Sequence, residues 1–166
     1  MIIGVLSDTH IPERADSLPQ KLLEEFKKVD MVIHAGDMID PKVLEELKKV
    51  CAKLVAVSGN MDPENIKHQV PAKVVLKIGT HTIGITHGFG HPKNLPAYLE
   101  NTFKKDKPDI IIFGHSHVPY NEERNGVLYF NPGSPTDTFF APYRSYGIIE
   151  INDKVKARIV KLEDGD

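Results

Sequence analysis

The sequence predicts an α/β fold in which short buried strands alternate with helices. In the first half, apolar runs of strand length alternate with segments whose apolar residues recur at helical spacing, which is typical of strand-helix-strand units in a parallel sheet. Near the end, Asn125-Gly126 and Asn152-Asp153 separate strand-like runs and predict antiparallel hairpins. A chain of 166 residues has the size of one domain, so we expect residues 1–166 to form a single domain.

The first half is predicted to supply three strands and two helices. We expect the strands at Ile2–Leu6, Met31–His34 and Leu54–Val57. Between them, Pro19–Phe26 and Pro41–Leu47 have apolar residues at helical spacing, and each begins with a proline suited to a first helical turn. These two helices should cover one face of the sheet.

The second half is expected to be mostly β. Gly79-Thr80 lies between two strand-like runs and predicts a tight turn. The expected elements are strands at Val74–Ile78, His81–Thr86, Ile110–Phe113, Gly147–Ile151 and Val155–Val160, with a helix around Leu95–Lys105.

Composition limits the partners that the chain is expected to have. Lys and Arg number 21 against 23 for Asp and Glu, so a net charge of -2 gives no electrostatic reason to expect a standing nucleic-acid partner. The single cysteine, Cys51, excludes an intrachain disulfide and fits a cytoplasmic location. The first run, Met1–Leu6, is too short for a signal peptide or membrane span, so we expect no membrane partner. A homo-oligomer remains open.

Polar residues suited to metal binding follow the predicted strands, where an α/β sheet presents its ligand-binding loops. They occur in Asp8-Thr9-His10, Gly36-Asp37, Gly59-Asn60, His87-Gly88 and Gly114-His115-Ser116-His117. In the first and last segments, one residue separates two ligand types, so an extended chain would point both side chains to the same side. The glycines before Asp37, Asn60 and His115 should let the backbone depart sharply from strand geometry.

Together these segments predict a centre with two metal ions. Its candidate ligands are Asp8, His10, Asp37, Asn60, His87, His115 and His117. Such a set exceeds the need of one four-coordinate zinc ion but suits two divalent ions bridged by one carboxylate, a role we assign to Asp37. Oxygen and nitrogen ligands favour transition metals, with Mn²⁺ or Ni²⁺ as first choices and Fe²⁺, Co²⁺ or Zn²⁺ as alternatives. Two divalent ions and two carboxylates give the site a net charge of about +2, which favours binding of a phosphate ester and a hydroxide.

At these residues the sequence resembles the calcineurin-like metallophosphoesterase superfamily, whose motifs read D-x-H, G-D, G-N, H and G-H-x-H in that order. Asn131-Pro132-Gly133-Ser134 also resembles a loop of its small phosphodiesterases of the YfcE or MJ0936 type. The resemblance covers essentially the whole chain. It implies a four-layer αββα sandwich of two mixed sheets flanked by helices, the metallo-dependent phosphatase-like fold.

The resemblance further implies how the ligands divide and how the reaction proceeds. One ion would be held by Asp8, His10, Asp37 and His117, and the other by Asp37, Asn60, His87 and His115. Hydrolysis would follow attack on phosphorus by a hydroxide that bridges the metals, with both ions stabilising the charge on the phosphoryl oxygens.

One position departs from the superfamily pattern. Many members continue G-N with a histidine thought to protonate the leaving group, whereas here Met61 follows Asn60. Met61 cannot donate a proton, so we expect the substrate to be a small phosphodiester whose leaving group departs unaided. The alternatives are a phosphomonoesterase, which Met61 disfavours, and a non-catalytic metal-binding scaffold resembling the small retromer subunit, which should tolerate broken ligand sets.

Four further features have weaker assignments. His91 is close enough in sequence to contact the leaving group, although a solvated loop residue is the more ordinary role. For His34 we favour a hydrogen-bonded core histidine over a partner that orients a ligand. Asp62 is either a turn residue or a residue that orients a ligand or contacts the substrate. For Phe139–Tyr143 we favour packing under the sheet over a pocket wall or subunit contact.

Overall fold

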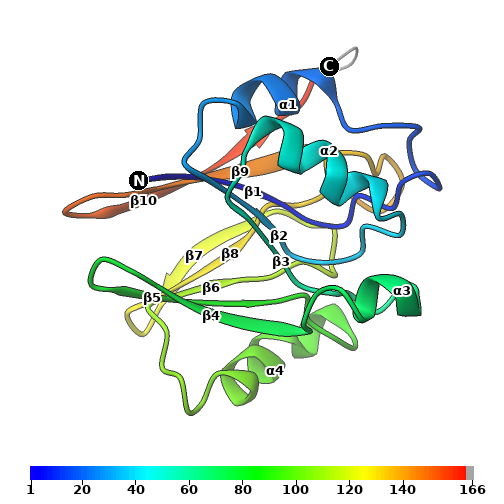
Figure 1. Cartoon of the computed structure of the whole chain (residues 1–166). Helices are drawn as coiled ribbons and strands as arrows, with labels where there is room; N and C mark the ends of the chain where they lie inside the picture. The colour runs from blue at the N-terminus through cyan, green and yellow to red at the C-terminus, as the bar shows by residue number, and fades with distance from the viewer. Residues whose placement is uncertain (164–166) are drawn as a thin grey trace.

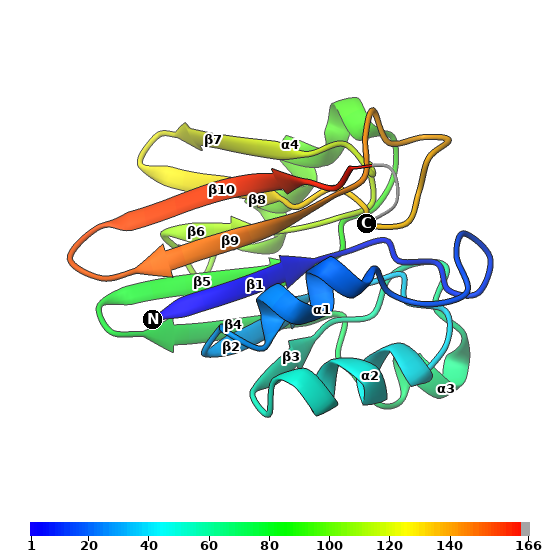
Figure 2. The ribbon, with the colours of Figure 1, turned by 90° about the horizontal axis from the view of Figure 1, so that it is seen from above.

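The computed structural model describes residues 1–163 as two five-stranded sheets that face each other, with helices on the outer faces (Figures 1 and 2). The first sheet has the order β10-β9-β1-β2-β3. Its members are β1 (Ile2–Leu6), β2 (Met31–His34), β3 (Leu54–Ala56), β9 (Ser145–Ile151) and β10 (Val155–Lys161). Strands β1, β2 and β3 are parallel and β9 and β10 are antiparallel, so the sheet is mixed.

The second sheet has the order β4-β5-β6-β8-β7 and is also mixed. Its members are β4 (Lys73–Ile78), β5 (His81–Thr86), β6 (Ile110–Ile112), β7 (Tyr120–Arg124) and β8 (Val127–Asn131). The central strands β5, β6 and β8 are parallel, while β4 and β7 at the edges are antiparallel to their neighbours. The parallel strands end at one end of the sandwich, which therefore gathers the loops that follow them.

Helices complete the four layers. On the outer face of the first sheet lie α1 (Gln20–Phe26) and α2 (Lys42–Val50), and on that of the second lies α4 (Leu95–Thr102), preceded by the 3₁₀ helix η1 (Pro92–Asn94) (Figure 1). A short helix, α3 (Glu64–Lys67), follows β3. The result is the αββα sandwich that the resemblance implied.

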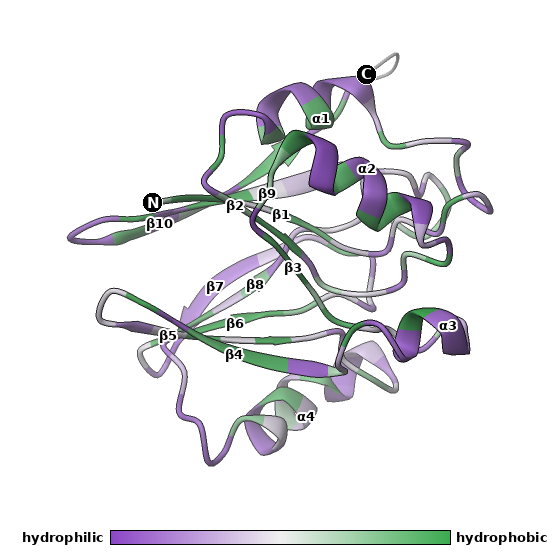
Figure 3. Cartoon of the chain, in the orientation of Figure 1, coloured by the Kyte–Doolittle hydropathy of each residue, from purple (hydrophilic) through white to green (hydrophobic). Residues whose placement is uncertain are grey.

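Three apolar clusters hold these layers together, which explains why the strands read as nearly continuous apolar runs. In β1, Ile3 and Val5 point into the core between the sheets, whereas Leu6 packs in the cluster under α1 and α2. A third cluster, which includes Leu99 and Phe103, joins α4 to the second sheet. Figure 3 shows the corresponding pattern, with apolar strands inside and polar residues on the outward side of the helices.

The predicted elements agree with the structure apart from their ends. β3 ends one residue before the predicted bound, α2 continues to Val50, and α4 ends at Thr102. Helix α3 was missed because four residues are too few to show a helical period. Within the described residues, no helix combines the length and apolar character needed to cross a membrane.

Candidate metal centre

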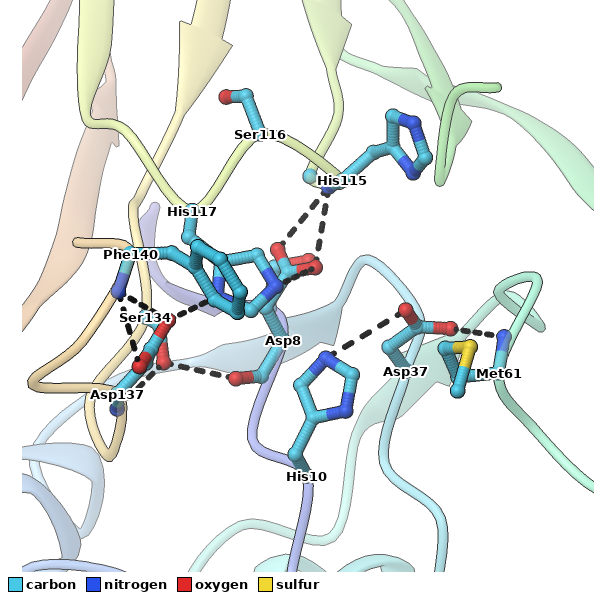
Figure 4. A network of polar contacts seen from close by, with 12 residues as sticks. Asp8, His10, Asp37, Met61, His115, Ser116, His117, Ser134, Asp137 and Phe140 are labelled. Carbon is cyan, nitrogen blue, oxygen red and sulfur yellow. Dashed lines mark hydrogen bonds and ion pairs between the residues drawn. The ribbon is translucent and has the colours of Figure 1, made fainter. Parts of the chain in front are cut away.

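The loops after β1, β2, β3, β5 and β6 converge at the end of the sandwich where the parallel strands finish. The backbone N–H of His115 donates to both carboxylate oxygens of Asp8 at 3.1 Å, although the two residues are 107 positions apart in the chain. The Nε2 of His117 lies 3.4 Å from Asp8 Oδ1, and the Nε2 of His10 lies 3.5 Å from Asp37 Oδ2 (Figure 4). The structure therefore brings the first and last predicted motifs together.

Among the described residues, two overlapping groups have ligand atoms that all lie within 4.8 Å of one another inside each group. The first group is Asp8, His10 and His117, and the second is Asp8, Asp37 and His87. Asp37 Oδ2 is 3.5 Å from His10 Nε2 and 3.2 Å from His87 Nε2, so it is close to one histidine of each group. Asp8 belongs to both groups in this geometry. The assignment of Asp37 as the bridging ligand stays a prediction that this position supports.

Asn60 and His115 form a more open part of the same site. His115 Nδ1 lies 2.9 Å from Asn60 Oδ1, and its Nε2 lies 2.7 Å from the carbonyl oxygen of Gly90. Because a carbonyl only accepts, Nε2 carries the donated proton, and a neutral ring then directs the lone pair of Nδ1 toward Asn60. Two acceptors that face each other in this way suit a shared cation.

In two other histidines, one ring nitrogen is likewise hydrogen-bonded to the protein while the other faces the centre. His87 Nδ1 donates to the carbonyl of Ala35 at 2.8 Å, and His117 Nδ1 donates to the carboxylate of Asp137. An outer hydrogen bond of this kind sets the orientation of metal-binding histidines. The buried Nε2 atoms of His10 and His87 make no well-aligned hydrogen bond among the described residues, and they lie 3.5 and 3.2 Å from Asp37 Oδ2. Imidazole nitrogens that face buried carboxylates in this way fit a divalent cation.

The electrostatics of the site favour positive charge. Burial acts to raise the pKa of Asp37, but the close contact with His87 and the charge of that ring outweigh burial and hold the pKa below its usual value. Burial acts to lower the pKa of His87, but Asp8 and Asp37 outweigh it and raise the pKa to about 9. The negative field that holds a proton on His87 also favours a metal cation in its place.

Five of the seven candidate ligands have left-handed backbone conformations, which non-glycine residues rarely adopt. They are Asp8 (φ 55°), His10 (φ 43°), Asp37 (φ 57°), His115 (φ 70°) and His117 (φ 58°). The extended geometry expected for Asp8-Thr9-His10 and His115-Ser116-His117 is therefore wrong. The side chains converge because the backbone curls at each ligand, and strain of this kind is concentrated at functional sites.

The glycines before the ligands act in two ways. Gly36 has a φ of 98°, which agrees with the expected departure from strand geometry. Gly59 and Gly114 are required for space instead, since a Cβ on Gly59 would lie 2.1 Å from Asp37 Oδ1 and one on Gly114 would lie 1.9 Å from Ser7 Oγ. At these two positions the sequence-based reason is wrong, because close approach of the loops excludes a side chain.

Asp62 and His34 support the backbone of the ligand loops. Asp62 is 2% exposed, and its carboxylate accepts hydrogen bonds from the backbone N–H groups of Asp37, Met38, Ile39 and Gly59 at 2.7–3.0 Å. It joins the loop after β2 to the loop after β3. This burial contradicts a contact with substrate and favours the alternative in which Asp62 orients a ligand loop.

His34 is fully buried between the loops after β1 and β2. Its Nδ1 accepts the N–H of Gly36 at 3.1 Å, so the neutral ring donates from Nε2 to Thr9 Oγ1, also at 3.1 Å. Burial lowers the pKa of His34 to about 4 and keeps the ring neutral. These contacts fit the favoured interpretation of a hydrogen-bonded core histidine.

His91 lies at the surface, where its Nδ1 accepts the backbone N–H of Lys93 at 3.2 Å and caps η1. Within residues 1–163, no hydrogen bond or ring contact joins the His91 side chain to the seven candidate ligands. Its role at the leaving group stays a prediction without structural support.

Sequence reasoning missed Asp137. The side chain is fully buried, and its carboxylate accepts hydrogen bonds from His117 Nδ1 and from the backbone N–H groups of Phe139 and Phe140. Asp137 therefore holds a candidate ligand and a turn at once. The signal that could have located it is the nearby Asn131–Ser134 loop, because Ser134 Oγ donates to the carbonyl of Asp8 and accepts the N–H of Asp137.

The Phe139–Tyr143 segment does not pack under the sheet, so that expectation is wrong. Phe139 is 77% exposed and Phe140 is 58% exposed. The turn that Asp137 stabilises leaves both rings exposed, with Phe140 next to His117 and Phe139 next to Phe140. A cavity of about 420 Å³ adjoins Asn60 and His87 elsewhere at the centre, whereas a cavity of about 680 Å³ near Arg14 contains none of the seven candidates.

A four-layer sandwich with clustered carboxylates and histidines at its strand ends is the architecture of a metal-dependent phosphoesterase. The family model described as the calcineurin-like phosphoesterase superfamily domain matches residues 1–154. The chain belongs to this superfamily.

Individual relatives agree with the family match. A probable metallophosphoesterase, MJ0623 of Methanocaldococcus jannaschii, is 39% identical over 99% of this chain and 83% of its own length. Phosphodiesterase MJ0936 of the same organism is 31% identical over 96% of this chain and 99% of its own. Among solved structures, Vacuolar Protein Sorting 29 from Cryptosporidium parvum superposes with a TM-score of 0.84 at 28% identity, covering 99% of this chain and 93% of that one.

Proposed function

We propose that this chain is a dinuclear metal-dependent phosphodiesterase that hydrolyses small phosphodiesters. Membership in the superfamily supports a hydrolase of phosphate esters that binds divalent metal. The observation that carries the proposal is that the Nε2 atoms of three histidines face two buried carboxylates within 3.5 Å, in two overlapping groups of ligand atoms. Hydrogen bonds on the outer nitrogens fix three of the histidine rings at the site.

We assign the candidate ligands to two parts of the metal centre. Asp8, His10 and His117 form one holding group, and Asp37 extends it toward His87. Asn60 and His115 complete the more open side, where a substrate oxygen has access. Bound divalent ions would supply an activated water at neutral pH and charge compensation for the phosphoryl oxygens. We propose two ions per chain, with Mn²⁺ or Ni²⁺ favoured, and a cytoplasmic location.

Met61 supports the preference for diesters. Its backbone N–H donates to Asp37 Oδ1 at 2.8 Å, which positions the residue beside the centre, while its exposed thioether has no proton to give. Esters with poor leaving groups would therefore lack an acid at this place. An aryl diester, whose leaving group departs unaided, is the substrate best matched to these residues.

A second candidate is a non-catalytic scaffold. The likeness to a Vps29 structure and the exposed Phe139 both favour a protein-binding surface near the centre. The complete donor set favours the enzyme, because a scaffold has no need to retain it.

Metal-reconstituted protein separates these candidates. We would remove bound metal, restore Mn²⁺, Ni²⁺, Co²⁺, Fe²⁺ or Zn²⁺ separately, and assay bis-p-nitrophenyl phosphate, p-nitrophenyl phosphate and cyclic nucleotides, with Asp37→Ala as control. We expect the aryl diester to react at least about tenfold faster than the monoester. Comparable rates on alkyl monoesters contradict the diester preference, and no turnover with any metal favours the scaffold.

A further inference from the structure

The metal centre is bordered by exposed apolar side chains, which we call the apolar rim. Met61 and Val118 directly follow candidate ligands in the chain, and Phe89 lines the cavity beside Asn60 and His87. Phe140 contacts His117, and Phe139 contacts Phe140. Exposed apolar groups that gather at one place mark a binding surface. A charged centre inside such a rim suits an anion that carries an apolar substituent.

Phe140 is the rim residue that is most firmly positioned. Its ring centroid lies 5.9 Å from that of His117 with the planes at 83°, and 4.8 Å from that of Phe139 at 86°. The guanidinium carbon of Arg14 lies 5.2 Å from the centroid of Phe140, and the backbone N–H of Phe140 lies 3.3 Å from both carboxylate oxygens of Asp137. Figure 4 shows the Phe140 ring beside His117.

This positioning has an energetic consequence. A side chain that is fixed by its neighbours loses little freedom when a ligand covers it, so its exposed surface contributes to binding at low entropic cost. Phe140 keeps 58% of its surface exposed, although its ring contacts His117, Phe139 and Arg14 and its backbone N–H is hydrogen-bonded. An aromatic group is the ligand chemistry that such a ring contacts best, through stacked or edge-on geometry.

We propose that Phe140 receives an aromatic arm of the phosphate ester bound at the centre. This inference rests on the proposed function and specifies its substrate class as phosphate esters with an aryl or heteroaromatic substituent. A phosphoryl group held beside His117 would place its ester substituents within reach of the Phe140 ring, because the two rings are in contact. Phe140 is then a specificity-determining residue.

Binding of two small phosphonates tests this inference without requiring turnover. We would measure the affinities of phenylphosphonate and methylphosphonate for the Mn²⁺-loaded protein by isothermal titration calorimetry. We expect phenylphosphonate to bind about tenfold more tightly, as one aromatic pair and its buried area would give. Phe140→Ala should abolish this preference while changing the affinity for methylphosphonate by less than about twofold, whereas Phe140→Tyr should retain the preference.

Two further variants complete the design. Tyr143→Ala removes an exposed aromatic from the same segment, whose ring contacts Lys161, and should leave the preference unchanged. Phe140→Leu keeps an apolar side chain against His117 without the ring and should lose most of the preference, which covers the case in which the alanine variant folds poorly.

Equal affinities of the two phosphonates for the unaltered protein overturn the inference, as does a preference that survives both Phe140→Ala and Phe140→Leu. In either case the proposed function stands if bis-p-nitrophenyl phosphate is hydrolysed. A loaded protein that binds neither phosphonate and hydrolyses no ester contradicts both proposals.

Discussion

The two sides of the candidate centre differ in how firmly the protein holds them. On one side, Asp8, His10 and His117 are buried, and His117 is held by a hydrogen bond to the buried Asp137. On the other, Asn60 is exposed and His115 is only partly buried, with its Nε2 hydrogen-bonded to a loop carbonyl and its Nδ1 facing Asn60. We refer to these as the buried side and the open side.

This difference indicates where the structure is prepared before any ligand arrives. On the buried side, packing and hydrogen bonds around the ligands fix the positions of their side chains. The open side is free to exchange its contacts for those of a substrate. We therefore expect the buried side to bind its ion more tightly and the open side to respond more strongly to substrate.

Asp37→Ala should erase the difference between the sides, because Asp37 Oδ2 lies between His10 and His87. If Asp37 bridges two ions as proposed, its loss should lower kcat/KM for an aryl diester by roughly 10³-fold, since metal ions supply several kcal/mol of charge stabilisation. Metal analysis of the purified variant should show less than one ion per chain. Asn60→Ala should retain one ion, and equal metal loss in both variants would contradict the comparison.

His34 tests whether the buried side makes folding sensitive to pH. The pKa of His34 falls from 6.5 to about 4 in the folded protein, so between these pH values the unfolded chain takes up a proton that the folded protein does not. The free energy of unfolding should therefore fall by up to about 3 kcal/mol as pH drops through this window, with no contribution from His34 above it. Urea denaturation of metal-free protein at pH 7 and 4.5 measures the change.

His34→Gln is the matched variant, because a neutral amide replaces the titrating ring. It should be less stable at pH 7 and should lose less additional stability on acidification than the unaltered protein. Parallel pH profiles for the two proteins would show that His34 does not carry the effect.

Asp137→Asn tests whether Asp137, which is not itself a candidate ligand, raises the metal affinity of the buried side through His117. The substitution keeps the side-chain shape but removes the charge that faces His117 Nδ1. We expect metal affinity of the buried side to fall roughly 10- to 100-fold, as for other partners of metal-binding histidines, measured by chelator competition. Asp153→Asn, at an exposed turn, is the control and should have no effect. An unchanged affinity in Asp137→Asn would assign Asp137 to the turn alone.

His91→Ala should have the smallest effect. His91 caps η1 at the surface, and no hydrogen bond among the described residues joins it to a ligand loop. We therefore expect turnover of an alkyl diester, a poor leaving-group substrate, to change by less than about twofold. A tenfold loss on this substrate with normal turnover of an aryl diester would restore His91 as a leaving-group contact.

Much of the fold follows from the sequence because its signals are local. Strands β1, β2 and β5 have the predicted bounds, since a buried strand is marked by its own apolar run and by the residues that interrupt it. The seven donors were identified by the same reasoning, because each follows such a run directly. The division of the strands into two sheets came from family resemblance and not from periodicity, which does not specify which strands pair.

The sequence by itself determined which side chains could bind metal and at which strand ends they occur, because short-range chemistry and periodicity encode both. Only the tertiary structure decided that Asp137 supports His117, that Asp62 joins two loops, and that Phe140 faces solvent. Asp137 is 20 positions from His117, and Asp62 is 25 from Asp37. Contacts over such separations depend on where the intervening chain returns, which the packing of both sheets sets.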